Sequence, residues 1–294
     1  MKRLKFAFFL GLLLSNVASA NELTLHIIAA PKPLNWNSVN GLLVSTALNS
    51  LHSYAIGHFA VEVKCDEPNS FGVSHFLTSM SPLDGRRDNK LILKSGLGLQ
   101  TLFYPFEGKL DDAPGLISDF AEMAAKGRYV RFVVPTTAQA CRNMMNFAEA
   151  WIKFGGYTVY GGGKDTARGE GAGCADFAER FYQLATGADF PENWVVRKEV
   201  PVRMIGGDGK RVSLLKLLLR KRWKKGNEEF VTYRSPEPTW AFFDSVREGF
   251  DPQELINPQN RRPNWETEVI DENSFIRHET KIEPQEIWNK IRMN

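Results

Sequence analysis

The stretch GAGCADFAERFYQLATG (171–187) predicts a helix that begins at a cysteine. Phe177 and Phe181 recur at helical spacing, with further apolar residues on the same face. Gly187 is typical of a residue that ends a helix, and the glycines before Cys174 let other backbone segments approach closely. We therefore expect Cys174 at the N-terminal end of a helix whose apolar face packs in the core.

Cys174 at this position has two interpretations. The backbone N–H groups of a helix N-terminus stabilise a thiolate, and a nearby imidazolium would lower the pKa of the thiol further. The N–H of Cys174 itself would point toward the negative charge that develops on a substrate carbonyl oxygen. The alternative is an inert structural cysteine, since free cysteines are among the most buried residues.

A second stretch, GHFAVEVKC (57–65), alternates as a strand and carries the best-placed histidine. The alternation puts His58 and Glu62 on one face and the large apolar residues on the other. Gly57 leaves space beside the ring, which allows His58 to meet a helix N-terminus. The alternative is a half-exposed histidine on a strand with no chemical role.

The order of these features resembles a known family. A Gly57-His58 strand, a hairpin, a helix, a glycine-rich approach and then Gly173-Cys174 at the start of a helix are similar to the circularly permuted branch of the NlpC-type papain-like cysteine hydrolases, which includes YiiX/YebB-like and lecithin:retinol acyltransferase-like proteins. The resemblance covers about residues 54–187 and depends on short motifs. It implies a papain-like α+β core, with Cys174 as the nucleophile and His58 as the general base.

That family also has a polar residue that orients the histidine from the next strand. Two strand-like runs predict a hairpin with a long turn, and counting symmetrically about the turn puts Ser79 or Met80 opposite His58. His75 falls nearer Glu62 by the same count. Ser79 is therefore the better geometric candidate and His75 the chemically stronger one, while Glu62 is a further possibility on the same face.

The fold class that we expect is α+β, a papain-like core of antiparallel sheet packed on helices. The core spans residues 21–190, and a C-terminal extension, 191–294, follows it. Beyond Pro191 the chain is rich in Lys and Arg, and then in Pro, Trp and Glu. The composition, 43% hydrophobic and 24% charged, is that of a folded globular protein and excludes disorder.

Residues 1–20 are interpreted as a cleaved secretory signal peptide, because three cations precede a short apolar run and the small residues Ala18-Ser19-Ala20. The run is too short for a membrane anchor, which needs about 20 apolar residues, and we expect no transmembrane segment in the mature chain. The mature chain retains 34 of the 37 cations and all 34 anions, so its charge gives no reason to expect a nucleic-acid partner. A periplasmic or secreted protein is expected.

An oxidising compartment makes the three cysteines informative. Cys174 is left as a thiol, while Cys65 and Cys141 either form a disulfide or are both buried and free. Cys65 ends the histidine strand, and Cys141 lies in a helix-like run, so the fold can bring the two together.

Other patterns are weaker. GGGK (161–164) fails the phosphate-loop motif, and no Cys or His pair has zinc spacing, so neither a cofactor nor a metal is expected. The basic run Arg220 to Lys225 favours contact with anionic glycan or lipid headgroups. The stronger interpretation is that these cations form the solvated face of a helix over 212–222. The opposite face of that helix would then face the core with Leu214, Leu215, Leu218 and Leu219.

The sequence thus predicts a cysteine hydrolase of the amidase or peptidase type, with cell-wall peptide as the leading substrate. Cys174 attacks the carbonyl carbon and His58 takes and returns the proton. A lipid acyl hydrolase or acyltransferase with the same pair is the alternative enzyme. A non-catalytic envelope-binding module is the alternative of another class, and the oligomeric state is left open.

Overall fold

The computed structural model describes residues 21–85, 96–206, 210–223, 226–236, 262, 265 and 270–293. The expected signal peptide, residues 1–20, lies outside the described residues. The strands are β1 (Glu22–Ile28), β2 (His58–Lys64), β3 (His75–Thr78), β4 (Met80–Pro82), β5 (Phe106–Leu110), β6 (Tyr129–Pro135), β7 (Val159–Tyr160), β8 (Val195–Pro201) and β9 (Phe230–Pro236). The helices are α1 (Val39–Asn49), α3 (Ala113–Ala125), α4 (Ala138–Lys153), α5 (Cys174–Thr186), α6 (Leu214–Leu218) and α9 (Pro284–Ile291).

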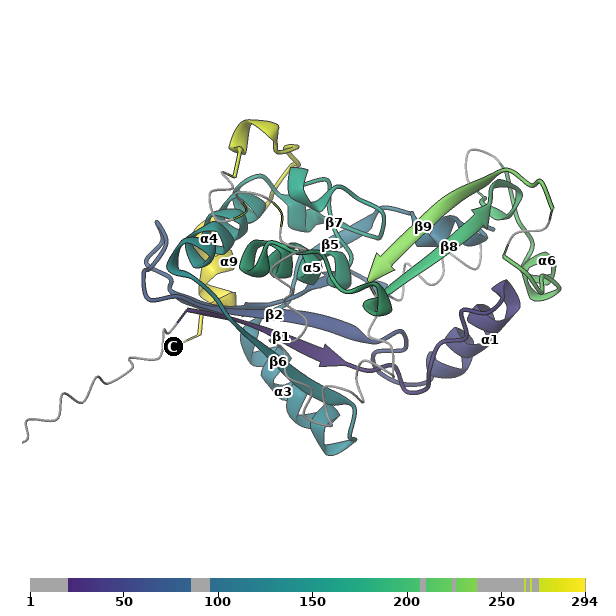
Figure 1. Ribbon diagram of the computed structural model, residues 1–294, viewed down its shortest axis with the longest axis horizontal. Helices are drawn as coiled ribbons and strands as arrows, with labels where there is room; N and C mark the ends of the chain where they lie inside the picture. The colour runs from purple at the N-terminus through teal and green to yellow at the C-terminus, as the bar shows by residue number, and fades with distance from the viewer. Residues whose placement is uncertain are drawn as a thin grey trace, which may run out of the picture.

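The fold is mixed α+β, with antiparallel sheets packed against helices, as the sequence predicts. The main sheet has the strand order β3-β2-β1-β6, and all its neighbouring strands are antiparallel. Helices α4, α5 and α9 lie on one side of this sheet and α3 on the other (Figure 1). Both faces are covered, which explains why six of the seven residues of β1 are buried. None of the helices in the described ranges is long and apolar enough to cross a membrane.

Helix α5 begins and ends where its glycines predict. Gly173 is the extended residue before the first turn, and Gly187 ends the helix in the left-handed conformation, at φ +77°. A Cβ atom on Gly187 would lie 2.3 Å from the Trp265 ring, so the close packing there also requires glycine. The apolar face, which includes Phe177 and Phe181, is buried in the main core.

The chain passes from the main sheet to a second sheet at Ser79. Strand β3 ends at Thr78, and β4 begins at Met80 and pairs with β5 instead of with β2. Strand β5 also pairs with β7, which gives the second sheet the order β4-β5-β7. Ser79 therefore lies between the two sheets, next to the residues that end β5.

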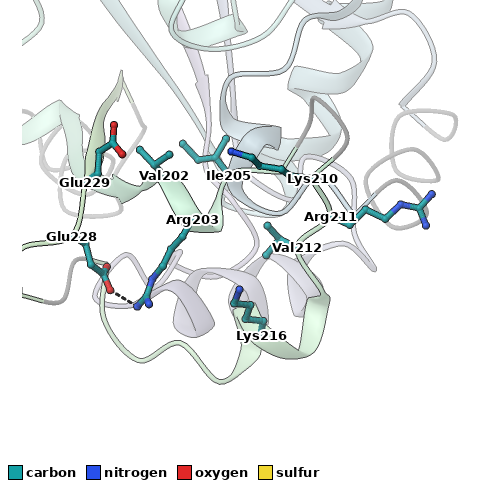
Figure 2. Close-up of a pocket in the computed structure, with 9 residues that line it drawn as sticks. All are labelled: Val202, Arg203, Ile205, Lys210, Arg211, Val212, Lys216, Glu228 and Glu229. Carbon is teal, nitrogen blue, oxygen red and sulfur yellow. Dashed lines mark ion pairs between the residues drawn. The ribbon is translucent and has the colours of Figure 1, made fainter.

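The strands β8 and β9 form a separate antiparallel hairpin. With residues 202–206 and 210–223 they make a lobe that we call the wing, which extends to the right in Figure 1 and is packed on α1 through a second apolar cluster. Arg234 of β9 joins the wing to α5 by two hydrogen bonds, 2.5 and 2.6 Å long, to the buried carboxylate of Glu179. A pocket of about 490 Å³ lies in the wing (Figure 2).

The expectation that four leucines near α6 face the core is wrong. Of the residues of α6 only Leu217 is buried. The exposed fractions are 52% for Leu214, 65% for Leu215, 40% for Leu218 and 71% for Leu219. The helix is only five residues long, and it contacts the second apolar cluster through Leu217 alone. The side chains on its other sides therefore point away from the cluster.

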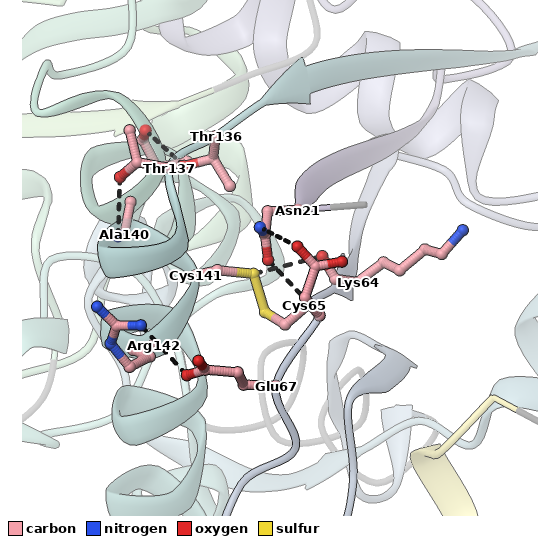
Figure 3. Close-up of a disulfide and its surroundings, with 11 residues drawn as sticks. Asn21, Lys64, Cys65, Glu67, Thr136, Thr137, Ala140, Cys141 and Arg142 are labelled. Atoms are coloured by element: carbon pink, nitrogen blue, oxygen red, sulfur yellow. Dashed lines mark hydrogen bonds and ion pairs between the residues drawn. A yellow bond between two sulfur atoms is a disulfide. The ribbon is translucent and has the colours of Figure 1, made fainter. Parts of the chain in front are cut away.

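A disulfide joins Cys65 to Cys141, with their Cα atoms 5.8 Å apart, and Cys174 is left free (Figure 3). Of the two states that the sequence left open for this pair, the structure has the bonded one. The bond ties the residue after β2 to α4, on the side of the sheet that α5 also covers.

A polar network lies on the α3 side of the main sheet. Glu62 accepts hydrogen bonds from His26 at 2.9 Å and from His75 at 2.7 Å, and His26 also contacts the Tyr129 hydroxyl at 2.7 Å. These hydrogen bonds, with that from His26 the strongest, hold the pKa of Glu62 at about 2 despite its partial burial. Glu62 thus crosslinks β1, β2 and β3 as a carboxylate.

We expect replacement of Cys65 and Cys141 by alanine to lower the free energy of unfolding by about 3 kcal/mol, because the bond closes a long loop in the unfolded chain. Urea denaturation measures the loss. Mass spectrometry of the unreduced, alkylated wild type should show one modified cysteine per chain. Three modified cysteines would contradict the disulfide.

We expect Glu62→Gln to lower the free energy of unfolding by about 2 kcal/mol at pH 7. The pKa of Glu62 is lower in the folded state than in the unfolded chain, so its contribution is complete above the unfolded pKa near 4.5 and is lost as the pH falls toward 2. The difference in stability between wild type and variant should therefore shrink from pH 5 to pH 3. A difference that stays constant over that range would be inconsistent with this role.

Candidate active site

Helix α5 and strand β2 pack against each other with their first residues together. Cys174 is the first residue of α5 and His58 the first of β2. Gly57, at φ +83°, turns the chain into β2 directly before the histidine. The structure thus brings the predicted thiol and imidazole into contact, and both side chains are buried.

Three groups hydrogen-bond the sulfur of Cys174: the His58 imidazole, the backbone N–H of Phe59 and the Tyr160 hydroxyl. Burial alone would raise the pKa of the Cys174 thiol, but the charge and hydrogen bond of His58 and the other two donors lower it below its usual value. Burial, and then the charge of the thiolate, raise the pKa of the Tyr160 hydroxyl, which therefore remains a hydrogen-bond donor.

Ser79 determines which nitrogen of His58 carries a proton in the neutral ring. Its hydroxyl lies 2.6 Å from the Phe59 carbonyl oxygen, which can only accept, and 2.8 Å from His58 Nε2. A hydroxyl has one proton, and the short contact to the carbonyl uses it, so Ser79 accepts from Nε2–H. This tautomer leaves Nδ1 as the nitrogen that can take the proton of the thiol.

Asp111 supplies the negative charge behind the imidazole. Its Oδ2 atom lies 3.7 Å from His58 Nε2 and accepts a 2.5 Å hydrogen bond from Ser81. Burial raises the pKa of Asp111, but His58, Ser81 and Lys109 together lower it, so the group is a carboxylate. Burial alone would lower the pKa of His58, but its interactions with Cys174 and Asp111 outweigh burial and raise the pKa to about 10. The two shifts together favour a thiolate and imidazolium pair over a neutral thiol and imidazole.

Asp176 lies in the first turn of α5, two residues after the thiol. Its carboxyl accepts a hydrogen bond from the Gly173 N–H, which fixes the start of the helix. Burial, and then the charge of Glu179, raise the pKa of Asp176 to about 7. Gly162 separates this carboxyl from Tyr233 of the wing, since a Cβ atom on Gly162 would be within 4 Å of both.

The remaining sequence candidates have different positions. Ser79 contacts His58 Nε2 through its hydroxyl, as the count of residues along the hairpin predicts. His75 lies opposite Lys64, six residues along β2 from His58, and its Nε2 is bound to Glu62. His75 and Glu62 are hydrogen-bonded to each other in the network on the α3 side of the sheet, so neither side chain contacts the His58 ring.

Sequence reasoning missed two members of the site, Asp111 and Tyr160. Asp111 directly follows β5, and Tyr160 ends the two-residue strand β7, just before the glycines at 161–163. The only signal in the sequence for Tyr160 is the glycine run that follows it, which indicates close packing of the backbone. The structure has such packing, because a side chain on Gly161 would collide with the Tyr104 carbonyl oxygen. In the described ranges no cluster of three His, Cys, Asp or Glu side chains has the arrangement of a metal site.

Comparisons of this chain with protein-family models, with curated proteins and with solved structures found no match.

We expect Cys174 to react with iodoacetamide at nearly the same rate from pH 6 to pH 9, because His58 keeps it ionised over that range. His58→Ala should slow the reaction at pH 6 about a hundredfold and restore the steep rise of an ordinary thiol with a pKa near 8.5. The measurement is the rate of adduct formation by mass spectrometry. Ser79→Ala should also slow it, and the matched control His75→Ala should not; equal effects of these two variants would refute the role of Ser79.

Proposed function

We propose that this protein is a cysteine hydrolase that cleaves an amide or peptide bond. The observation that carries the proposal is the hydrogen-bond chain from the Phe59 carbonyl through Ser79 and His58 to Cys174. A structural cysteine gains nothing from an imidazole of fixed tautomer, whereas a nucleophile that must lose and return a proton depends on one. The resemblance of the Gly57-His58 and Gly173-Cys174 motifs to permuted NlpC-type hydrolases agrees with this function.

In the first half of the reaction the thiolate of Cys174 attacks the carbonyl carbon, and a carbon–sulfur bond forms. The electron pair of the double bond moves to oxygen, to which the backbone N–H of Cys174 at the helix N-terminus and the Tyr160 hydroxyl can donate hydrogen bonds. His58 then gives its Nδ1 proton to the leaving nitrogen. The carbon–nitrogen bond breaks, an amine departs and a thioester remains on Cys174.

In the second half, Nδ1 of His58 accepts a proton from water as the water oxygen attacks the thioester. The carbon–sulfur bond breaks, a carboxylic acid leaves and the thiolate and imidazolium pair is restored. The Asp111 carboxylate stabilises the imidazolium at both stages, and Ser79 keeps the ring in one orientation throughout.

Cell-wall peptide is the substrate class that we favour. The half-buried Asp176 carboxyl lies in the same helix turn as the nucleophile, and it is a suitable acceptor for the N–H groups of a peptide. The same carboxyl is an unfavourable neighbour for a lipid acyl chain, because a polar group next to an apolar ligand loses its hydration without a replacement.

The test is to trap the thioester. Wild-type protein incubated with peptidoglycan peptides and quenched in acid should carry an adduct on Cys174 whose mass is that of the acyl half of the peptide, and hydroxylamine should remove it. Cys174→Ser should release less than about one thousandth as much amine while it stays folded, since the hydroxyl is a far weaker nucleophile.

His75→Ala is the matched control, and it should retain the adduct and the turnover. A fatty-acyl adduct formed from lipid, with none from peptide, would replace the amidase by a lipid acyl hydrolase. Binding to cell-wall material without adduct or product from either substrate would mean that the protein is a binding module.

A further inference from the structure

The exposed leucines near α6 form an apolar surface that the fold does not use. Leu214, Leu215, Leu218 and Leu219 lie within six consecutive residues, and each is at least 40% exposed. Figure 1 shows α6 at the outer end of the wing, with α5 at the centre of the molecule. The leucines are therefore remote from the candidate active site. Four large exposed apolar side chains within six residues form a patch, unlike the single apolar residues that are scattered over most protein surfaces.

Exposed cations surround these leucines. Lys216 lies on α6 itself, and Lys221 and Arg222 come three and four residues after its end. None of the three pairs with a carboxylate within the part of the chain that the structure describes. Arg220, which belongs to the same basic run, is different: it is buried and bound to Glu228, so it stabilises the wing and is not available to a partner.

The pocket in the wing extends this basic surface. Lys210 and Lys216 project into it from opposite sides, over an apolar lining that includes Val212 (Figure 2). Arg203 lines it too, but this arginine is held by Glu228. Four cations and two carboxylates, Glu228 and Glu229, line the pocket, so its net charge is positive. It is continuous with α6 through Lys216, and its lysines suit a phosphate-bearing headgroup.

The charge of the wing indicates the kind of partner. Residues 195–236 contain 12 Lys and Arg but four Asp and Glu, whereas the mature chain as a whole has equal numbers of both signs. Two copies of the wing would therefore repel each other, and the wing would be attracted to an anionic surface while the rest of the molecule is repelled from it. A glycan offers such charge but no apolar interior for leucines. A bilayer with anionic lipids offers both.

We propose that the leucines of α6 and the cations around them bind the surface of a bilayer that contains anionic lipids. The leucines enter the boundary between headgroups and acyl chains, and Lys210, Lys216, Lys221 and Arg222 contact phosphates. Docked in this way, the wing holds the protein at the membrane while α5, at the centre of the molecule, lies away from the lipid. This interaction is independent of the hydrolase activity.

The test is flotation of the mature protein with vesicles. Vesicles with one third phosphatidylglycerol should bind the wild type at least tenfold better than pure phosphatidylcholine, and 0.5 M NaCl should abolish most of the difference. Leu215→Gln with Leu219→Gln should reduce binding at least tenfold, and Lys221→Glu with Arg222→Glu should do the same. The matched control is Ile117→Gln, which alters an exposed apolar residue of α3 and should bind as the wild type does.

The iodoacetamide reaction of Cys174 provides a check of folding for each variant, because it depends on the packing of α5 against β2. Failure of the wild type to float with anionic vesicles would overturn the proposal. Equal binding by the leucine variant in its folded form would also overturn it. If the wild type instead forms a dimer that the leucine variant abolishes, and no vesicle binding is seen, the surface is a contact between copies.

Discussion

The packing of α5 against β2, with the first residue of each at the same end, is the constraint on which the site depends. A helix N-terminus has backbone N–H groups without partners, and Cys174 is placed where they act on its side chain. A shift of β2 by one residue would turn His58 to the other face of the sheet. A shift of Cys174 by one position along α5 would rotate its thiol by about 100° around the helix axis. Neither residue has its chemistry without the alignment of both elements.

The passage from one sheet to the other supplies the groups behind the histidine. Ser79 lies at that passage, where its hydroxyl reaches both the Phe59 carbonyl and the His58 ring. Asp111 follows the strand that pairs with β4, and its backbone N–H donates to the Ser79 carbonyl oxygen at 2.9 Å. The same hydrogen bonds that join the sheets therefore also hold the serine and the carboxylate in place around the ring.

Sequence periodicity predicted the local elements well and the contacts between them in part. The helix at Cys174 and the strand at His58 have strong patterns and clear glycine boundaries, and a symmetric hairpin count pointed to Ser79. Asp111 and Tyr160 come from the second sheet, and β7 is too short to have a pattern. The leucines near α6 were misjudged because spacing shows which residues share a face, and it does not show whether another element covers that face. The structure confirms the α+β architecture, and the papain-like arrangement of the core stays a prediction.

The disulfide between Cys65 and Cys141 has a consequence for how the chain matures. Three cysteines permit three different pairings, and two of them consume Cys174. In the hydrolase that we propose, an isomer with either of those bonds would lack its nucleophile. For that proposed enzyme, activity and oxidative folding are coupled: a disulfide isomerase that acts on this chain would restore catalysis, and a turnover assay would report the fraction of molecules that had oxidised correctly.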